Sequence, residues 1–316
     1  MRSLRRGGDT TTTCIVNPRV LRELDCVDIK DDKANNARII LVVGGRWSVV
    51  GGGCAGMEAA RRAAFSGHKV ILCESKNQLG GQIKIAESIP VRHEIGDIIP
   101  WYEGQLKKLD VDIRLNVTAN QQLLSEVNPD VVVIATGSLP KVPQSFMESI
   151  YNIADINLVM ADEVLEESIA TGNNVLIIGG DQIGMQIADY LADKNKIVTV
   201  VEEHNHFAEK LAANDRWYLI ARIIQKGVRR IKNMKKIEIL PDDEVWIVTG
   251  EGRENLPDID TIVLASERQS ERSLAELSEK IGIETHIIGD AKDVVGEASA
   301  MIMTSIAQGY DLARQL

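Results

Sequence analysis

The hydrophobic pattern of the chain alternates between two kinds of segment. Short runs rich in valine and isoleucine, typical of strands buried in a parallel sheet, occur at residues 68–74, 111–115, 129–137, 174–178 and 197–202. Elsewhere, apolar residues recur at helical spacing and predict helices at about 57–64, 95–109 and 183–191. The pattern therefore predicts an α/β protein.

Two glycine-rich turns each join a predicted strand to a predicted helix. The first, residues 51–56, reads Gly-Gly-Gly-Cys-Ala-Gly, and the second, residues 179–184, reads Gly-Gly-Asp-Gln-Ile-Gly. An acidic residue follows the first glycine of each turn by 23 positions, Glu74 in one case and Glu202 in the other. One such fingerprint is weak evidence, but two with the same offset predict two dinucleotide-binding βαβ units in series.

The first unit has the features that nucleotide binding needs. Gly51 permits a tight turn, Gly53 lets the backbone approach a pyrophosphate, and Gly56 lets the helix pack closely on the sheet. Residues 48–50 are predicted to end the strand that precedes this turn. The carboxylate of Glu74, at the end of the next strand, suits a pair of ribose hydroxyls.

The strand before the first turn has two candidate sequences. Residues 39–45 read Ile-Ile-Leu-Val-Val-Gly-Gly, and residues 48–52 read Ser-Val-Val-Gly-Gly. Only the second copy leads directly into the fingerprint, so the first is either a hairpin arm that turns at Gly44 and Gly45 or a local duplication. The sequence leaves open which copy occupies the central strand.

The second unit departs from the fingerprint at Asp181, which stands where the middle glycine belongs. A side chain there crowds the pyrophosphate, and its carboxylate faces two negatively charged phosphates. The unit is therefore predicted either to bind a nicotinamide nucleotide or to be retained for structure alone. Glu202 and Glu203 favour a free ribose hydroxyl over a 2′-phosphate, so NADH is expected in preference to NADPH.

Composition narrows the classes of function. The 316 residues suffice for two domains, and the net charge of −10 gives no basic footprint, so no nucleic-acid partner is expected. No apolar run reaches membrane-spanning length and no signal-peptide pattern is present, so a cytoplasmic location without membrane contact is expected. The spacing of His204 and His206 is too common in loops to predict a metal site.

The four cysteines are Cys14, Cys26, Cys54 and Cys73. No two of them have the CxxC or CxxxxC spacing of a redox-active disulfide. Cys54 in the first glycine turn and Cys73 in a predicted strand are most simply packing residues. Thiol–disulfide reductase chemistry is therefore not expected.

Several short motifs carry a family resemblance. Three of them are similar to the FAD-contacting motifs of flavoprotein reductases that bind two dinucleotides: residues 79–82 (Leu-Gly-Gly-Gln), 135–137 (Ala-Thr-Gly) and 288–291 (Ile-Gly-Asp-Ala). More narrowly, residues 14–18 and 56–61 resemble the C-terminal half of the old-yellow-enzyme-like NADH:flavin oxidoreductases. That family includes 2,4-dienoyl-CoA reductase, 2-enoate reductase and trimethylamine dehydrogenase, and the resemblance covers residues 12–316.

The resemblance implies two Rossmann-like domains of the glutathione-reductase type, the second inserted in the first. An irregular arm at 1–36 precedes an FAD-binding domain at 37–140 plus 285–316, and an NAD(P)-binding domain occupies 141–284. Together with the first fingerprint it implies that FAD contacts Gly51, Gly53, Cys54, Ala55, Gly56, Glu74, Gly81, Gln82, Ala135, Thr136, Gly137, Gly289 and Asp290. The expected NAD site comprises Gly179, Gly180, Gln182, Ile183, Gly184 and Glu202.

The resemblance also implies a function, which is hydride transfer from nicotinamide C4 to flavin N5 followed by delivery of electrons to an acceptor. In the family the acceptor is an iron–sulfur cluster and then an FMN-carrying barrel that reduces enoates or related substrates. Cys14 matches the last cluster cysteine, but the other three have no counterpart, so a cluster requires ligands from a partner. The expected partners are an FMN and iron–sulfur barrel subunit or a second copy of the chain.

No catalytic side chain is assigned, because the cofactors of such flavoproteins perform the chemistry. The family typically has a glycine near Glu267, so this residue and Asp181 both depart from the pattern on the NAD side. Two alternatives therefore remain. The alternatives to an active oxidoreductase are a nucleotide-binding structural subunit and a truncated, non-catalytic fragment of such an enzyme.

Overall fold

The computed structural model divides the chain into two compact units. Unit 1 comprises residues 1–84, 95–139 and 269–316, and unit 2 comprises residues 85–94 and 140–268. The structure describes residues 14, 16–20, 22, 34, 36–44, 51–142, 146, 153–209, 211, 213–240, 243–265, 268–294 and 302–316. Most of the predicted arm at 1–36 therefore lies outside the described residues, as do Cys26 and Glu267.

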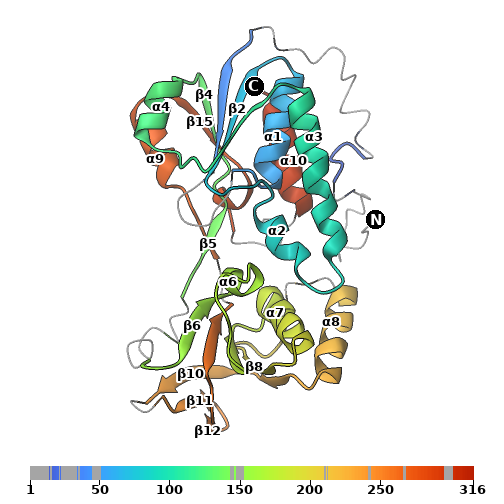
Figure 1. Cartoon of the computed structure of the whole chain (residues 1–316), viewed down its shortest axis with the longest axis vertical. Helices are drawn as coiled ribbons and strands as arrows, with labels where there is room; N and C mark the ends of the chain where they lie inside the picture. The colour runs from blue at the N-terminus through green and yellow to red at the C-terminus, as the bar shows by residue number, and fades with distance from the viewer. Residues whose placement is uncertain are drawn as a thin grey trace. The chain divides into compact units, whose positions relative to one another are not determined.

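A five-stranded parallel sheet forms the centre of unit 1 (Figure 1). Its strands are β1 (Ile39–Val43), β2 (Lys69–Glu74), β3 (Asp112–Leu115), β4 (Val131–Ile134) and β15 (Glu284–Ile287). They lie in the order β15-β4-β1-β2-β3. The carboxyl ends of all five strands therefore meet at one edge, where ligands bind in open α/β sheets.

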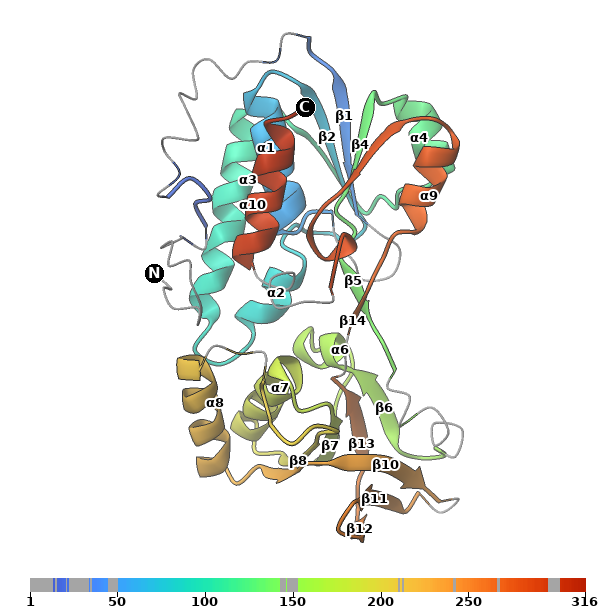
Figure 2. The same cartoon turned by 180° about the vertical axis from the view of Figure 1, so that it is seen from behind.

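Helices cover both faces of this sheet (Figures 1 and 2). α1 (Cys54–Phe65), α3 (Ile98–Lys108) and α10 (Ile302–Ala313) share one core cluster with alternate strand residues such as Ile40 and Val42. The opposite strand residues, including Leu41 and Val43, pack against α4 (Gln121–Val127) and α9 (Ser273–Lys280). Both faces are buried, which explains why the strand runs are apolar throughout.

The remaining elements around unit 1 and its connections to unit 2 are short. They are α2 (Gln82–Glu87), the 3₁₀ turns η1 (His93–Asp97) and η3 (Gly289–Ala291), and the paired strands β5 (Ser138–Pro140) and β14 (Arg268–Ser270). β5 and β14 mark two of the four places where the chain passes between the units; the other two lie at the ends of residues 85–94.

Unit 2 contains a second five-stranded parallel sheet, in the order β6-β13-β7-β8-β9. Its strands are β6 (Asn157–Met160), β7 (Asn174–Ile178), β8 (Ile197–Val201), β9 (Arg229–Ile231) and β13 (Thr261–Leu264). One face packs in a cluster with the helices α6 (Ala161–Leu165), α7 (Gln182–Asp193) and α8 (Ala213–Gln225). The other face packs against an antiparallel sheet of β10 (Met234–Ile239), β11 (Val245–Thr249) and β12 (Arg253–Leu256).

The fold class predicted from the sequence is confirmed, but the boundaries of the units differ from the predicted domains. Residues 269–284 were expected in the second domain and lie in unit 1, because α9 packs against β15 and β4. Residues 85–94 lie in unit 2, because Ile85 and Ile89 belong to its core.

The sheet of unit 1 also decides between the two copies of the Val-Val-Gly-Gly sequence. Residues 39–43 form the central strand β1, which pairs in parallel with β2 and β4. The prediction that residues 48–50 end this strand is wrong, and so is a hairpin role for the first copy. Residues 45–50 themselves lie outside the described residues.

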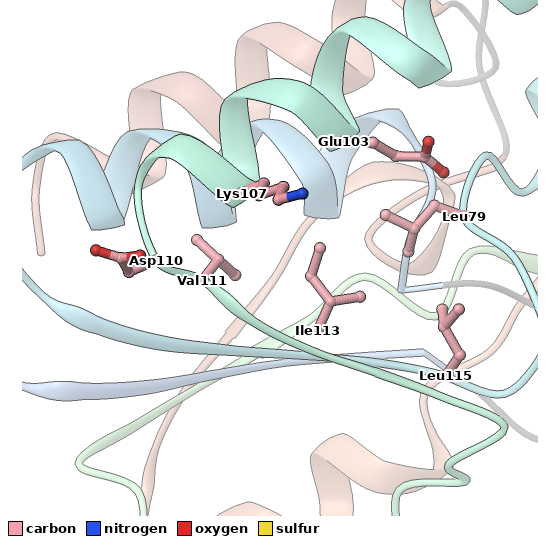
Figure 3. A pocket seen from close by; sticks show the side chains of 7 residues that line it. All are labelled: Leu79, Glu103, Lys107, Asp110, Val111, Ile113 and Leu115. Carbon is pink, nitrogen blue, oxygen red and sulfur yellow. The ribbon is translucent and has the colours of Figure 1, made fainter.

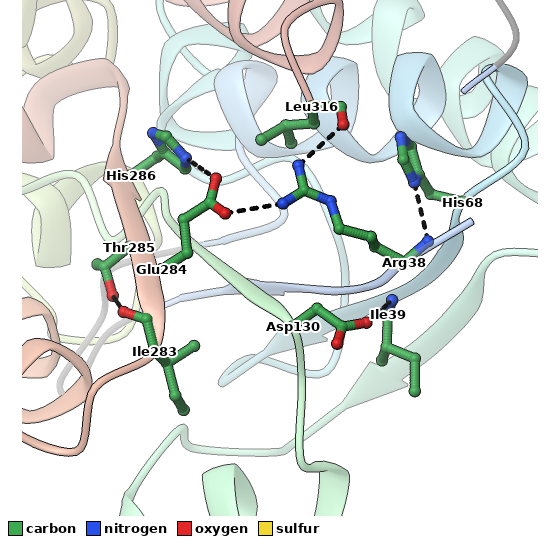
Figure 4. A network of polar contacts seen from close by, with 9 residues as sticks. All are labelled: Arg38, Ile39, His68, Asp130, Ile283, Glu284, Thr285, His286 and Leu316. Carbon is green, nitrogen blue, oxygen red and sulfur yellow. Dashed lines mark hydrogen bonds and ion pairs between the residues drawn. The ribbon is translucent and has the colours of Figure 1, made fainter. Parts of the chain in front are cut away.

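A polar network joins the amino ends of the unit 1 strands to the end of the chain (Figure 4). The Arg38 guanidinium donates to Glu284 Oε2 at 2.7 Å and to the Leu316 carbonyl at 2.8 Å, while Asp130 accepts from the first N–H of β1. The hydrogen bond from His286, together with Arg38, lowers the pKa of Glu284. The glycine turns follow the opposite ends of the strands, so this network is structural.

In unit 2, a buried carboxylate joins α7 to α8. Asp189, 1% exposed, contacts Arg222 Nη2 at 2.9 Å and Lys226 Nζ at 2.6 Å. We expect Asp189→Asn to lower the free energy of unfolding by about 2 kcal/mol, because two partly buried cations lose their buried counter-charge and keep only the exposed Asp193. Chemical denaturation monitored by circular dichroism measures this change.

The matched control is Asp193→Asn. Asp193 contacts the same Lys226 Nζ at 2.6 Å, but its side chain is 48% exposed, so its loss should cost less than about 1 kcal/mol. Equal destabilisation by the two variants would show that the burial of Asp189 does not determine its contribution.

Candidate functional site

The two glycine turns hold their acidic residues in the same hydrogen-bond frame. In unit 1, Gly52 N–H donates to Glu74 Oε2 at 2.9 Å and Lys76 N–H donates to Oε1 at 2.7 Å. In unit 2, Gly180 N–H donates to Glu202 Oε2 at 2.6 Å and His204 N–H donates to Oε1 at 2.9 Å. Each carboxylate is thereby fixed beside the turn that precedes its helix.

The loop after each acid returns to the turn in the same way. Gly80 N–H donates to the Gly52 carbonyl, and Ala208 N–H donates to the Gly180 carbonyl, both at 2.8 Å. A Cβ on Gly52 would lie 2.5 Å from the Leu79 side chain, and one on Gly180 would lie 2.5 Å from the Phe207 ring. Every matched pair is 128 positions apart, so the two units repeat without a gap from the turn through this loop.

The last glycine of each turn brings the helix against the strand. A Cβ on Gly56 would lie 1.9 Å from the Gly51 carbonyl oxygen, and one on Gly184 would lie 1.8 Å from the Gly179 carbonyl oxygen. A side chain at either position would push the helix away from the turn. The first N–H groups of α1 and α7 consequently point toward the turn, as anion binding requires.

Before the turn, the two units differ by an insertion. Ile178, at the end of β7, lies 24 positions before Glu202, whereas Val43, at the end of β1, lies 31 positions before Glu74. Gly44 N–H donates to the Cys73 carbonyl, as Gly179 N–H does to that of Val201. Gly51, however, supplies the carbonyl next to Gly56.

In unit 1, Gly44 and Gly51 therefore lie together where unit 2 has a single glycine, Gly179. A Cβ built on Gly51 would lie 2.3 Å from Gly44 N and 2.5 Å from Val43 C. Both glycines approach the place that Gly179 fills alone in unit 2. The seven additional residues of unit 1 are thus an insertion into an otherwise complete dinucleotide turn.

Asp181 and Gly53 occupy equivalent N-cap positions. Asp181 has φ −79° and ψ −166°, and Gly53 has φ −71° and ψ 177°, both of which are extended conformations open to any residue. Neither helix has a side-chain cap hydrogen bond from this position. The backbone conformation is thus nearly the same at Gly53 and Asp181. The two units differ here only in the Asp181 side chain, which takes up space and adds a negative charge where a ligand would approach.

Several predicted FAD residues from distant parts of the sequence meet in unit 1. Asp290 Oδ2 accepts from Gln82 Nε2 at 3.0 Å and from Ser138 Oγ at 3.2 Å. Gly289, at φ +64°, donates its N–H to Gln308 Oε1 at 2.7 Å. Sequence reasoning missed Ser138 and Gln308, although Ser138 directly follows the Ala-Thr-Gly motif and so could have been included.

The other predicted residues border the strands and helices of their own units. Ala135 N–H donates to the Val43 carbonyl, and Thr136 Oγ1 donates to the Glu271 carbonyl at 2.5 Å. Gly81 and Gly137 both adopt positive φ, which favours glycine. Cys54 and Ala55 begin α1, and Gln182 and Ile183 begin α7. Cofactor contact by these residues stays a prediction.

Electrostatics distinguish the two acids. Glu74 is fully buried, and burial raises the pKa of its carboxyl, with the N–H donors of Lys76 and Gly52 acting in the opposite direction. Glu202 is 6% exposed and lies 2.8 Å from Nδ1 of His204. The hydrogen bond to Glu202 raises the pKa of His204.

A groove of about 590 Å³ runs between α3 and the edge strand β3 (Figure 3). Val111, Ile113 and Leu115 form its apolar floor, and Glu103 and Lys107 of α3 lie on its rim. The groove contains none of the predicted cofactor residues, although Leu79 at one end also contacts the glycine turn.

Three of the four cysteines lie among the described residues. Cys14, Cys54 and Cys73 form no disulfide, and burial raises the pKa of Cys54 to about 12 and that of Cys73 to about 11. Both thiols are therefore protonated near neutral pH and are poor nucleophiles. Among the described residues, no group of three His, Cys, Asp or Glu side chains comes together as a metal site, so Cys14 belongs to no such group there.

We accordingly expect no NADH-dependent reduction of a disulfide substrate such as dithionitrobenzoate. Slow alkylation of Cys54 and Cys73 by iodoacetamide at neutral pH, followed by mass spectrometry, provides an independent check. A disulfide reductase activity that disappears in Cys54→Ser or Cys73→Ser would contradict this expectation.

The fold and the repeated carboxylate frame define a protein with two Rossmann-type dinucleotide units in series. A family model for pyridine nucleotide-disulphide oxidoreductases matches residues 46–293, and the chain belongs to this family. Among the helices of the described residues, none combines the length and apolar character needed to cross a membrane.

Relatives with known activities are similar over almost the whole chain. The NADH oxidase of Thermoanaerobacter brockii is 32% identical over 306 residues, covering 96% of this chain and 44% of the relative. The cinnamate reductase of Clostridium sporogenes is 32% identical over 313 residues, covering 97% and 43% respectively. A solved 2-naphthoyl-CoA reductase complex has a TM-score of 0.82 at 29% identity, with 96% and 43% coverage.

The chain thus spans less than half the length of these relatives. The comparisons confirm the resemblance to the FAD- and NAD(P)-binding half of the 2-enoate-reductase type of enzyme. They also confirm that the chain is a flavoprotein oxidoreductase module.

Proposed function

We propose that unit 1 binds FAD and unit 2 binds NADH, and that the chain passes reducing equivalents from the second nucleotide to the first. The repeated carboxylate frame carries this proposal. Glu74 and Glu202 receive matching backbone N–H bonds beside turns where Gly52 and Gly180 leave no room for a side chain. Such a cradle fits a ribose on the carboxylate and a pyrophosphate on the helix N-terminus.

The residues of the chain hold and orient the cofactors. Bound FAD would supply the redox chemistry, since it accepts a hydride and can release its electrons singly. In unit 1, Asp290 with Gln82 and Ser138 offers a polar cluster near the same end of the sheet as the glycine turn, which suits the hydroxyl-rich chain of a flavin nucleotide. The residues of this cluster lie outside the segments over which the two units repeat, residues 51–80 and 179–208.

We further propose that unit 2 prefers NADH to NADPH. Glu202 is held with one oxygen on Gly180 N–H and the other on His204 N–H, the arrangement that accepts hydrogen bonds from a ribose diol. Glu203 adds a second negative charge beside it. Both would repel the 2′-phosphate of NADPH.

The electron acceptor is proposed to lie in a further domain or subunit. The relatives are more than twice as long as the matched segment, and they include an NADH oxidase and a cinnamate reductase. An iron–sulfur and FMN barrel partner, with Cys14 as one cluster ligand, would allow the reduction of an enoate-type substrate. A second copy of the chain is the other proposed partner.

Two observations favour a second candidate, a nucleotide-binding structural subunit or a truncated fragment without turnover. Asp181 places a carboxylate at the N-cap of α7, where a pyrophosphate would approach. In unit 1, Gly44 and Gly51 share one glycine position of the turn. Each feature weakens a nucleotide site without disturbing the fold.

Two spectra test the proposal. The purified protein should absorb at about 450 nm if it retains flavin, and anaerobic NADH should bleach this band. A colourless protein that remains colourless after incubation with FAD would contradict a flavin site. A yellow protein that NADH does not bleach would support the structural candidate. NADPH in place of NADH tests the nucleotide preference in the same cuvette.

A further inference from the structure

His204 lies directly on the carboxylate proposed to bind the ribose. Its Nδ1 is 2.8 Å from Glu202 Oε1, and its own N–H donates to the same oxygen at 2.9 Å. The His204 side chain is 74% exposed, whereas that of Glu202 is 8% exposed. The imidazole therefore covers the solvent side of a buried carboxylate, where the 2′ position of a bound nucleotide would lie.

Unit 1 has a lysine at the equivalent position. Lys76 follows Glu74 by two residues, as His204 follows Glu202, and its N–H makes the same bond to Oε1. The repeat thus places a basic residue beside each ribose-binding acid. Only in unit 2 does this residue change its charge between pH 5 and 8.

The other charges around His204 are mostly negative. Glu202, Glu203 and Glu209 of the same loop all act to raise the pKa of the imidazole, the hydrogen bond to Glu202 most strongly. The packed turn between β9 and β10 contributes Asn233 N–H, which donates to the His204 carbonyl, and carries Lys232 next to it. A protonated His204 therefore neutralises one of the negative charges that surround it.

We propose that His204 sets the choice between NADH and NADPH in unit 2. When protonated, it neutralises Glu202 and presents an N–H group to a 2′-phosphate. When neutral, it leaves the Glu202 charge uncompensated, so that a ribose hydroxyl is accepted and a phosphate is repelled. The inference rests on the proposed nucleotide site of unit 2 and adds a titratable specificity residue to it.

Calorimetric titration with NAD⁺ and NADP⁺ at about pH 6 and about pH 9 tests this role by binding alone. The ratio of the dissociation constants, NADP⁺ over NAD⁺, should rise about tenfold from the lower to the higher pH in the wild type. His204→Gln keeps a hydrogen-bond donor without the charge, and its ratio should change much less. His206→Gln, an exposed histidine two residues later, should follow the wild type.

The 2′-phosphate of NADP⁺ itself titrates in this pH range and changes the ratio equally in the wild type, His204→Gln and His206→Gln. The difference between the wild type and His204→Gln therefore reports the effect of His204 alone. If both nucleotides bind and the His204→Gln ratio follows the wild type, the inference is overturned while the proposed function stands. If neither nucleotide binds at either pH, the nucleotide site of unit 2 is overturned and the inference with it.

Discussion

Replacing Gly53 with aspartate is expected to abolish flavin retention, whereas the opposite change in unit 2, Asp181→Gly, should tighten NADH binding. The two residues occupy equivalent N-cap positions with nearly the same backbone angles. Each variant therefore installs in one unit the residue that the other unit carries. Since φ is negative at both sites, neither change strains the backbone.

The expected magnitude follows from the charge on the ligand. A carboxylate beside a partly desolvated pyrophosphate costs on the order of 1–3 kcal/mol, or about 5- to 150-fold in affinity. Asp181→Gly should recover this factor for NADH. Gly53→Asp should lose at least as much for FAD, because its Cβ also occupies the space into which the pyrophosphate fits.

Flavin content after purification and NADH titration by fluorescence measure the two effects. Gly53→Ala, which adds a Cβ but no charge, separates the steric part from the electrostatic part. A Gly53→Asp protein with normal flavin content would mean that FAD does not use this turn. An Asp181→Gly protein with unchanged NADH affinity would favour the structural role for unit 2.

Deletion of residues 44–50 is expected to raise both flavin content and thermal stability. The deletion joins Val43 directly to Gly51 and recreates the connection that Ile178 makes to Gly179 in unit 2. In the present chain a Cβ on Gly51 would lie 2.3 Å from Gly44 N, so two residues approach one position. Removing the inserted loop eliminates a closure cost of about 2 kcal/mol and restores a single glycine at the turn.

The control places the same seven residues between Ile178 and Gly179. If insertions of this kind weaken a dinucleotide turn, NADH affinity should fall while FAD content stays unchanged. Thermal melts and the absorbance ratio at about 450 nm to about 280 nm report the outcome. A deletion variant with less flavin or a lower melting temperature would show that the inserted residues contribute to the site.

The local parts of the site could be predicted from sequence. The glycine turn, the helix and the acid follow one another within 23 positions in each unit, so their spacing alone places Glu74 and Glu202 beside their turns. The return of the loop after each acid was not predicted as a repeat. Its matching residues, Leu79 with Phe207 and Gly80 with Ala208, share little beyond their positions.

The cluster around Asp290 needed the tertiary structure. Gln82 and Asp290 are 208 positions apart, and Ser138 comes from a third segment. A family resemblance grouped Gln82 with Asp290, but no spacing rule connects them or adds Ser138. The boundary of unit 1 differs from that of the predicted domain for the same reason, since α9 joins unit 1 through its packing on β15 and β4.

The α/β class, the two dinucleotide-type units and the acids beside their turns could all be predicted from sequence, because these features depend on short-range periodicity and spacing. The choice of the Val-Val-Gly-Gly copy that forms the central strand depends instead on tertiary packing. In that strand Ile40 and Leu41 are fully buried, and the second copy would put Trp47 and Ser48 in their places. A large ring and a hydroxyl fit poorly at two closely packed apolar positions, so packing on both sheet faces selects residues 39–43.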